Sequence, residues 1–160
     1  MIIRQTDDFN DVNVLGIGYL WSRGQSKLMT EVTTKFGFKL SFNVVTRVKK
    51  IVQTITYKDE PEKSVQKKTY DYQFCLLAIY ARSIDPATYA MAKTLSKGEY
   101  IMFFGRERQI AYPSRNGGEI EATEVTLDGL IPIGRINTAL LGGDVSMAFS
   151  DIYQAQTWQD

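Results

Sequence analysis

The chain has 160 residues, of which 44% are hydrophobic and 23% charged, and this is ordinary for one globular domain with its own core. Histidine is absent and cysteine occurs once, as Cys75. These counts exclude histidine-based nucleophile pairs, internal disulfides and cysteine-rich zinc sites. No apolar run reaches the length of about 18 residues that spans a membrane, and no signal peptide is recognisable, so we expect a cytoplasmic location.

The formal net charge of +1 conceals an uneven distribution of charge along the chain. Residues 27–68 hold ten basic and four acidic residues, whereas residues 119–160 hold one basic and seven acidic residues. This asymmetry predicts a polyanionic partner for the basic middle and a separate acidic element at the C-terminal end. The alternative is that the two are solvated faces of opposite sign that attract each other.

Alternation of apolar and polar residues with a period of two predicts five strands. The longest spans residues 34–49, carries its basic residues on one face and is expected to bend at Gly37. We expect it to continue into a protruding basic hairpin whose turn lies at residues 58–63. The other four strands are expected at residues 12–21, 69–80, 100–112 and 119–127, with a hairpin turn at residues 114–118 between the last two.

One helix is predicted after the third strand. Asp85 suits the N-cap, Pro86 suits the first helical position, and Gly98 follows the last residues of the apolar stripe. Five strands with one helix between the third and the fourth is the order of an OB-fold, a partly open Greek-key barrel, so the expected class is mainly all-β. The expected organisation is an N-terminal extension at 1–11, an OB-fold domain at 12–131 and a partly flexible acidic segment at 132–160.

The residue pattern argues against an enzyme. Glu119 and Glu121 alternate on a strand where their side chains face water, which is no arrangement for a catalytic pair. Gly16 and Gly18 do not complete a glycine-rich phosphate loop and suit a tightly curved strand instead. Cys75 is expected to be a packed thiol. We therefore expect no catalysis, no metal and no cofactor, with a metal-dependent nuclease as a remote alternative.

Basic and aromatic residues are interleaved on the same predicted strands. Single-stranded nucleic acid needs cations that hold phosphates and flat rings on which bases stack. Tyrosine suits a half-exposed stacking site, and Trp21 is a further candidate. The rings expected in the barrel interior are Phe36, Phe38, Phe42, Phe74 and Phe104. The candidate DNA-binding residues are Lys35, Lys39, Arg47, Lys49, Lys50, Tyr57, Tyr70, Tyr72, Tyr80, Arg106, Arg108 and Tyr112.

Residues 95–106, which read LSKGEYIMFFGR, resemble a stretch of bacterial and phage single-stranded-DNA-binding proteins (the SSB family). That stretch has a leucine, a lysine and a glycine, then apolar strand residues and a glycine-arginine pair. Arg106 matches this pair directly, and other candidate residues are approximate neighbours of the family's DNA-contacting positions. The resemblance covers about residues 12–131. Further similar stretches are 42–47, 74–80, 116–117 and 123–125.

The resemblance implies an OB-fold that binds and protects single-stranded DNA without sequence preference, in replication or recombination. It also implies a homo-oligomer, a dimer or a tetramer, built partly through the first strand. Cellular members of the family end in a long linker and an acidic tip closed by proline-phenylalanine, whereas this chain ends AQTWQD. It is therefore more similar to a phage or plasmid member, which would act in the host cytoplasm.

Two roles remain open for the acidic C-terminal segment, which either competes with DNA for the basic groove or contacts replication and recombination proteins. Two functional alternatives remain as well. One is an OB-fold protein that binds RNA or assists replication, and the other is a structural phage assembly protein.

Overall fold

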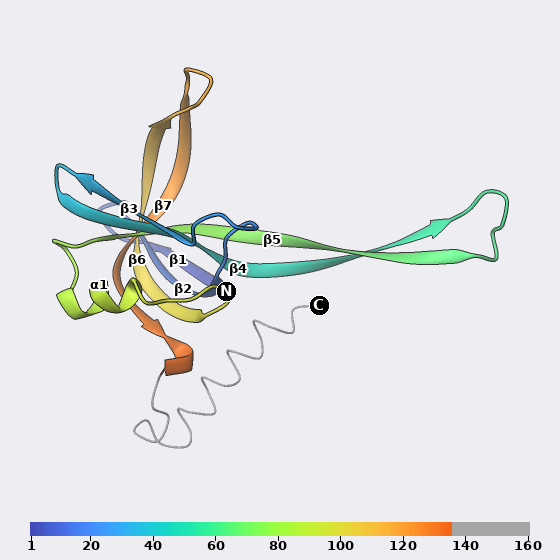
Figure 1. Cartoon of the computed structure of the whole chain (residues 1–160), viewed down its shortest axis with the longest axis horizontal. Helices are drawn as coiled ribbons and strands as arrows, with labels where there is room; N and C mark the ends of the chain where they lie inside the picture. The colour runs from blue at the N-terminus through green and yellow to red at the C-terminus, as the bar shows by residue number, and fades with distance from the viewer. Residues whose placement is uncertain (136–160) are drawn as a thin grey trace.

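One seven-stranded sheet forms most of the part of the chain that this computed structural model describes, residues 1–135. The strands follow one another along the sheet in the order β1-β2-β6-β7-β5-β4-β3 (Figure 1). The acidic segment predicted at 132–160 lies outside the described residues from position 136 onward. The strands are β1 (Ile2–Thr6), β2 (Val12–Leu20), β3 (Met29–Thr34), β4 (Gly37–Thr56), β5 (Ser64–Tyr80), β6 (Tyr100–Pro113) and β7 (Glu119–Pro132).

Five of the strands, β2, β4, β5, β6 and β7, form a partly closed ring. Two short pairings complete it: the parallel β5–β7 pairing, which begins at Leu76 and Glu124, and the β2–β4 pairing of Tyr19 with Val45. These are the five strands that the alternation predicts, and the ring is compatible with an OB-like barrel. The predicted strand count is nevertheless wrong, because β1 and β3 are added at the two ends of the strand order.

The two additional strands lie where the sequence pattern is weak. β1 is short and mostly exposed, and it falls within the stretch predicted as an N-terminal extension, where it pairs with β2. β3 pairs with β4 through a turn that Gly37 closes with φ +97°, a conformation that favours glycine. Gly37 is therefore a turn residue between two strands, and the predicted bend within one long strand is wrong.

The predicted helix is present between β5 and β6 and starts at Pro86 as expected, but α1 (Pro86–Ala92) ends well before the predicted stop at Gly98. The Asp85 carboxylate accepts a hydrogen bond from the backbone N–H of Thr88 at 3.1 Å, which satisfies one of the free donors at the helix N-terminus. Among the described residues, no helix is long and apolar enough to cross a membrane.

The core lies inside the ring and under α1. Leu20, Leu77, Ile101 and Phe103 are fully buried there, and burial of each such side chain contributes about 1.5–3 kcal/mol. Phe103 packs so closely against β2 that a Cβ atom at Gly16 would lie 2.3 Å from its ring. Gly16 therefore permits the tight approach of β2 to the core.

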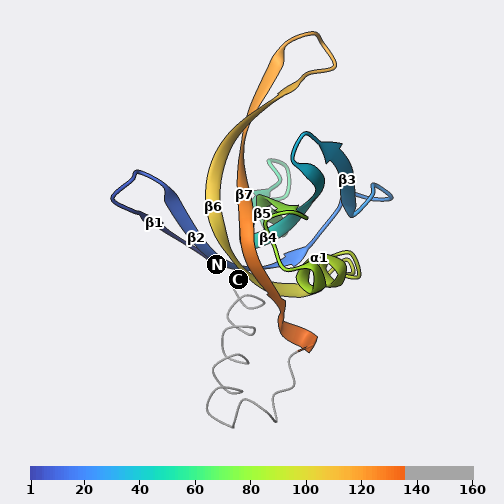
Figure 2. The ribbon, with the colours of Figure 1, turned by 90° about the vertical axis from the view of Figure 1, so that its left-hand side faces the viewer.

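Two hairpins project from the ring in different directions (Figures 1 and 2). We name the first the β4–β5 arm; it comprises residues 47–73, and its ten residue pairs run from Arg47 and Gln73 to Thr56 and Ser64. Among residues 1–135, neither strand of the arm pairs with a third strand, because the β2–β4 and β5–β7 pairings end nearer the ring. The second, the β6–β7 hairpin, comprises residues 109–123 and turns at residues 114–118, as predicted.

Candidate nucleic-acid interface

One face of β5 carries a row of aromatic side chains. The row begins on the β4–β5 arm and continues where β5 is part of the partly closed ring of strands. Successive side chains of a strand point to opposite faces. The odd-numbered residues from 75 to 79 are buried in the core, whereas Tyr70, Tyr72 and Phe74 are exposed on the other face and Tyr80 is half-buried there. We call these four rings, together with Trp21, the aromatic face.

Trp21 lies against two rings at the centre of the aromatic face and forms a cluster with them. Its ring centroid lies 6.4 Å from that of Tyr72 with an interplanar angle of 21°, and 5.3 Å from that of Phe74. The Lys97 ammonium lies 5.4 Å from the Trp21 ring centroid. Phe74 is 46% and Tyr72 41% exposed, so the cluster presents flat apolar surface to solvent beside a cation. A nucleobase stacks on such a surface, and the cation attracts its phosphate.

The predicted interior role of the phenylalanines is wrong for four of the five. Phe42 is 2% exposed and lies in the core. The other four are half-exposed because the alternation places them on the outer face of their strands or, for Phe36, in the β3–β4 turn. Phe74 lies at an even-numbered position of β5, as Tyr70 and Tyr72 do. This alternation in the sequence could have assigned it to the aromatic face. The exposed four are Phe36, Phe38, Phe74 and Phe104.

A β-bulge at the base of the arm divides the candidate cations of β4 between two faces. Before it, Lys39 pairs with Tyr80 and Val45 with Phe74; after it, Arg47 pairs with Gln73. The extra residue, Thr46, reverses the alternation, so Arg47 and Lys49 lie on the reverse of the arm. Lys50, opposite Tyr70, lies on the aromatic face. The single basic face expected along this strand is therefore wrong.

Lys39 has a partner inside the protein. Its ammonium lies 2.6 Å from the carboxylate of Glu124, which is 1% exposed, and 5.5 Å from the Tyr80 ring centroid. Burial alone would lower the pKa of Lys39, but the hydrogen bond and the charge of Glu124 raise it above its usual value. Lys39 thus compensates a buried carboxylate.

Arg106 and Arg108 extend the candidate surface onto β6. Arg108 lies 3.2 Å from Asp11, and Arg106 lies 3.9 Å from Asp11 and 3.8 Å from Asp128. These are exposed pairs, worth about 0–1 kcal/mol, and a phosphate can replace either carboxylate. A shallow pocket brings Arg108 to Tyr80 and to Arg82, a cation absent from the sequence-based candidates. This pocket is lined by Phe36, Tyr80, Arg82, Ser83, Arg108 and Thr126.

Three candidates lie at tips. The Lys35 ammonium lies 4.9 Å from the centroid of Phe36 in the β3–β4 turn. Tyr57 begins the exposed tip of the β4–β5 arm, and Tyr112 lies near the end of the β6–β7 hairpin. The structure does not gather these three with the Trp21 cluster.

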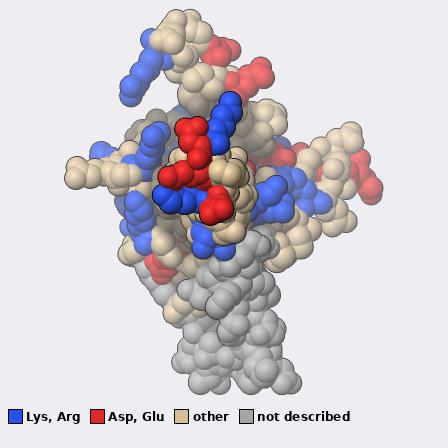
Figure 3. All heavy atoms as spheres, turned by 90° about the vertical axis from the view of Figure 1, so that its right-hand side faces the viewer, with Lys and Arg blue, Asp and Glu red and all other residues tan. Residues whose placement is uncertain are grey.

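Charge is distributed unevenly along the arm. Viewed down the arm from its tip, acidic side chains gather near the centre, and lysines and arginines surround them (Figure 3). The tip contributes Asp59, Glu60 and Glu62, of which Glu60 pairs with Lys63 at 2.6 Å. The seven basic and four acidic residues of the arm leave it net positive.

Comparison with known proteins gives structural likeness without sequence relatives. No family model matches the chain, and no curated protein matches it. The chain is similar to the crystal structure of a small single-stranded DNA-binding protein from Streptomyces coelicolor, with a TM-score of 0.46, 10% identity, and coverage of 77% of this chain and 94% of that one. It is also similar to an SSB of Plasmodium falciparum in complex with ssDNA, with a TM-score of 0.43, 14% identity, and coverage of 74% and 91%.

Proposed function

We propose that the chain binds single-stranded DNA without sequence preference. Bases stack on the aromatic face, and the surrounding cations hold phosphates. The observation that carries this proposal is the Trp21, Tyr72 and Phe74 cluster, because adjacent rings on a sheet face, with Tyr72 and Phe74 exposed to water, mark a binding surface rather than a core. Every base has a π-face, so stacking of this kind tolerates any sequence.

The geometry favours a single strand over a duplex. In a duplex the faces of the bases are covered by their neighbours, and a protein reads only the base edges in the grooves. The aromatic face offers flat rings, which need unstacked bases. Lys50, Lys97 and Arg108 lie beside these rings, where they can follow the phosphates of an extended strand.

The test measures fluorescence anisotropy of labelled oligo-dT and of a duplex of equal length, between about 50 mM and about 200 mM salt. We expect the single strand to bind more tightly, with an affinity that falls with salt at a slope of about −0.7 per phosphate neutralised. Equal affinity for the duplex, or an affinity that does not change with salt, would contradict the proposal.

A second measurement reports on Trp21 directly. The chain has two tryptophans, so Trp158→Phe leaves Trp21 as the only source of tryptophan emission. We expect oligo-dT to quench this emission because a base stacks on the indole. Bound DNA with unchanged emission removes Trp21 from the interface.

The biological setting that we propose is the protection of single strands during replication or recombination. Stacking alone does not distinguish DNA from RNA, since the 2′-hydroxyl is the group that separates them. Oligo-dT and oligo-U of equal length therefore discriminate between this role and that of an RNA-binding protein. Tighter binding of oligo-U would support the RNA alternative.

We further propose that the chain forms a homo-oligomer through the outer face of β1, β2 and β6. Ile3, Leu15 and Phe104 are paired in register across these strands, and each is about half-exposed. β1 ends the strand order beside them, so a second copy can cover both the apolar row and the strand edge. Light scattering should give a mass above 18.2 kDa, and Leu15→Glu should lower it. A monomeric wild-type protein would exclude this surface.

A further inference from the structure

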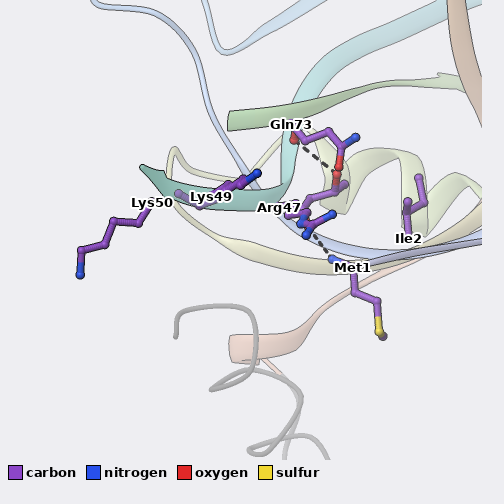
Figure 4. A pocket seen from close by; sticks show the side chains of 8 residues that line it. Met1, Ile2, Arg47, Lys49, Lys50 and Gln73 are labelled. Carbon is purple, nitrogen blue, oxygen red and sulfur yellow. Dashed lines mark hydrogen bonds between the residues drawn. The ribbon is translucent and has the colours of Figure 1, made fainter. Parts of the chain in front are cut away.

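The reverse of the β4–β5 arm carries a second feature, a pocket at the base of the arm. It lies between the arm and the start of β1, and Met1, Arg47, Lys49 and Gln73 contribute to its lining (Figure 4). Arg47, Lys49 and Gln73 lie on the face opposite the rings because of the bulge at Thr46. None of the described residues that line the pocket is acidic or aromatic.

The chemistry of this lining suits an anion without a ring. A guanidinium, an ammonium and a side-chain amide supply N–H donors, and the guanidinium forms two parallel hydrogen bonds with phosphate. The backbone oxygens of Ile17 and Thr46 accept hydrogen bonds from the Met1 ammonium, which borders the pocket. Burial, and then the charge of Arg47, lower the pKa of this ammonium to about 6. The positive charge of Arg47 therefore acts on a group at the edge of the pocket.

One acidic residue of the same face lies nearby. Asp71 is the cross-strand partner of Lys49, two residue pairs farther along the arm than Arg47 and Gln73. It is not part of the pocket lining. Lys50 also borders the pocket, but it points away from Arg47 and Met1 (Figure 4). Arg47 and Lys49 are therefore the two cations whose removal tests the pocket.

We infer that this pocket binds a backbone phosphate of the same strand whose bases stack on the aromatic face, so that the strand passes around one edge of the arm. The inference rests on the proposed function. The arm is two strands wide, about 10 Å, and no third strand of the described part of the chain pairs with either of its edges. An oligonucleotide of a few nucleotides therefore reaches either the aromatic face or the pocket, and a longer oligonucleotide reaches both.

The test uses oligo-dT from about 4 to about 30 nucleotides long, a range that spans the site sizes of OB-folds. Arg47→Gln with Lys49→Gln removes the pocket cations. We expect the variant to bind the shortest oligonucleotides that the wild type binds with unchanged affinity, and to bind the longest about tenfold more weakly, with a shallower salt dependence. The length at which the two proteins diverge marks the passage from one face to the other.

A matched control removes two charges from the same arm outside the pocket. Lys58→Gln with Lys67→Gln alters the tip and the outer part of the reverse face. We expect it to weaken binding slightly and equally at all lengths, because it changes only the general attraction between the arm and DNA. All four positions are exposed, and circular dichroism checks that both variants keep the fold.

The outcomes separate the two proposals. Loss of the same size at every length, or no loss at any length, in the Arg47 and Lys49 variant overturns the phosphate pocket and leaves the aromatic face intact. A wild-type protein that binds no oligonucleotide overturns the proposed function, and the pocket assignment fails with it. Side-chain amide resonances of Gln73 that shift with long but not with short oligo-dT support the pocket independently.

Discussion

The β4–β5 arm and the β6–β7 hairpin are both antiparallel ribbons that leave the ring with no third strand from the described residues, yet they differ in the surfaces that they present. Residues 47–73 carry seven basic and four acidic residues and continue the aromatic face. Residues 109–123 carry one basic and two acidic residues, with Tyr112 as their aromatic side chain. A projecting ribbon is therefore not in itself a nucleic-acid surface; in our proposal, aromatic rings in register and surrounding cations make the arm one.

The largest expected effect contrasts the rings of the two ribbons. Tyr72→Ala with Phe74→Ala removes two stacking rings, each worth about 1–3 kcal/mol, so we expect DNA affinity to fall by about 2–6 kcal/mol. Tyr112→Ala with Ile120→Ala removes the one aromatic ring of the β6–β7 hairpin and its apolar cross-strand partner. Anisotropy titrations with oligo-dT compare the two variants. An equal loss of affinity in both variants would mean that the two hairpins contribute equally to DNA binding, and would contradict the prediction.

The next effect concerns Lys39 of β4, whose ammonium pairs with the Glu124 carboxylate of β7. Lys39→Met leaves the Glu124 carboxylate buried without its cation, and we expect the free energy of unfolding to fall by about 3 kcal/mol. Urea denaturation measures this loss. Adding Glu124→Leu to the same chain should restore most of it, because no unpaired charge remains buried. If Lys39→Met unfolded at the same urea concentration as the wild type, the ion pair with Glu124 would not be needed for stability. Lys39 would then count among the surface cations available to DNA.

A smaller effect is expected at the base of the β6–β7 hairpin. Arg106→Glu with Arg108→Glu replaces two phosphate partners by repelling charges, and we expect the affinity for oligo-dT to fall at least about tenfold, with a shallower salt slope. The fold should persist, because the pairs that these arginines make with Asp11 are exposed. Arg115→Glu, in the turn of the same hairpin, is the control. If Arg115→Glu weakens binding as much, the whole hairpin contributes to the interface.

The smallest effect tests the covered side of β5. Cys75 is adjacent to Phe74 in sequence but faces the core, and burial raises the pKa of its thiol to about 11. At pH 8 we therefore expect a thiol reagent to react slowly with the folded chain and rapidly in denaturant, with or without DNA. Fast reaction of Cys75 in the native protein would show that the strands beneath the aromatic face separate and expose the core.

Much of the fold could be predicted because alternation is strong where one side of a strand is buried. The five ring strands, α1 and the two turns follow from period-two patterns, from the Asp85–Pro86 cap and from glycine positions. β1 and β3 carry mostly exposed side chains, so they leave no such pattern. The strand count was underestimated for this reason.

The candidate site was harder to predict because one inserted residue decides which side chains share a face. The sequence places Lys39, Arg47 and Lys49 at odd positions of one strand, but the bulge at Thr46 moves the last two to the reverse. The residue types near position 46 do not predict a β-bulge. Hydrophobicity also misassigned Phe74, whereas its register with Tyr70 and Tyr72 identifies its face.

The open edges of the β4–β5 arm have a thermodynamic consequence. An isolated two-stranded hairpin is marginally stable in water, and fixing the backbone of each residue costs about 1–2 kcal/mol in conformational entropy. Ordering the arm against a bound strand therefore consumes part of the stacking energy, so the measured affinity is a net value. We expect the association to release heat and to carry a negative heat-capacity change. In the proposed complex, bound DNA supplies the packing that a third strand provides elsewhere in the sheet.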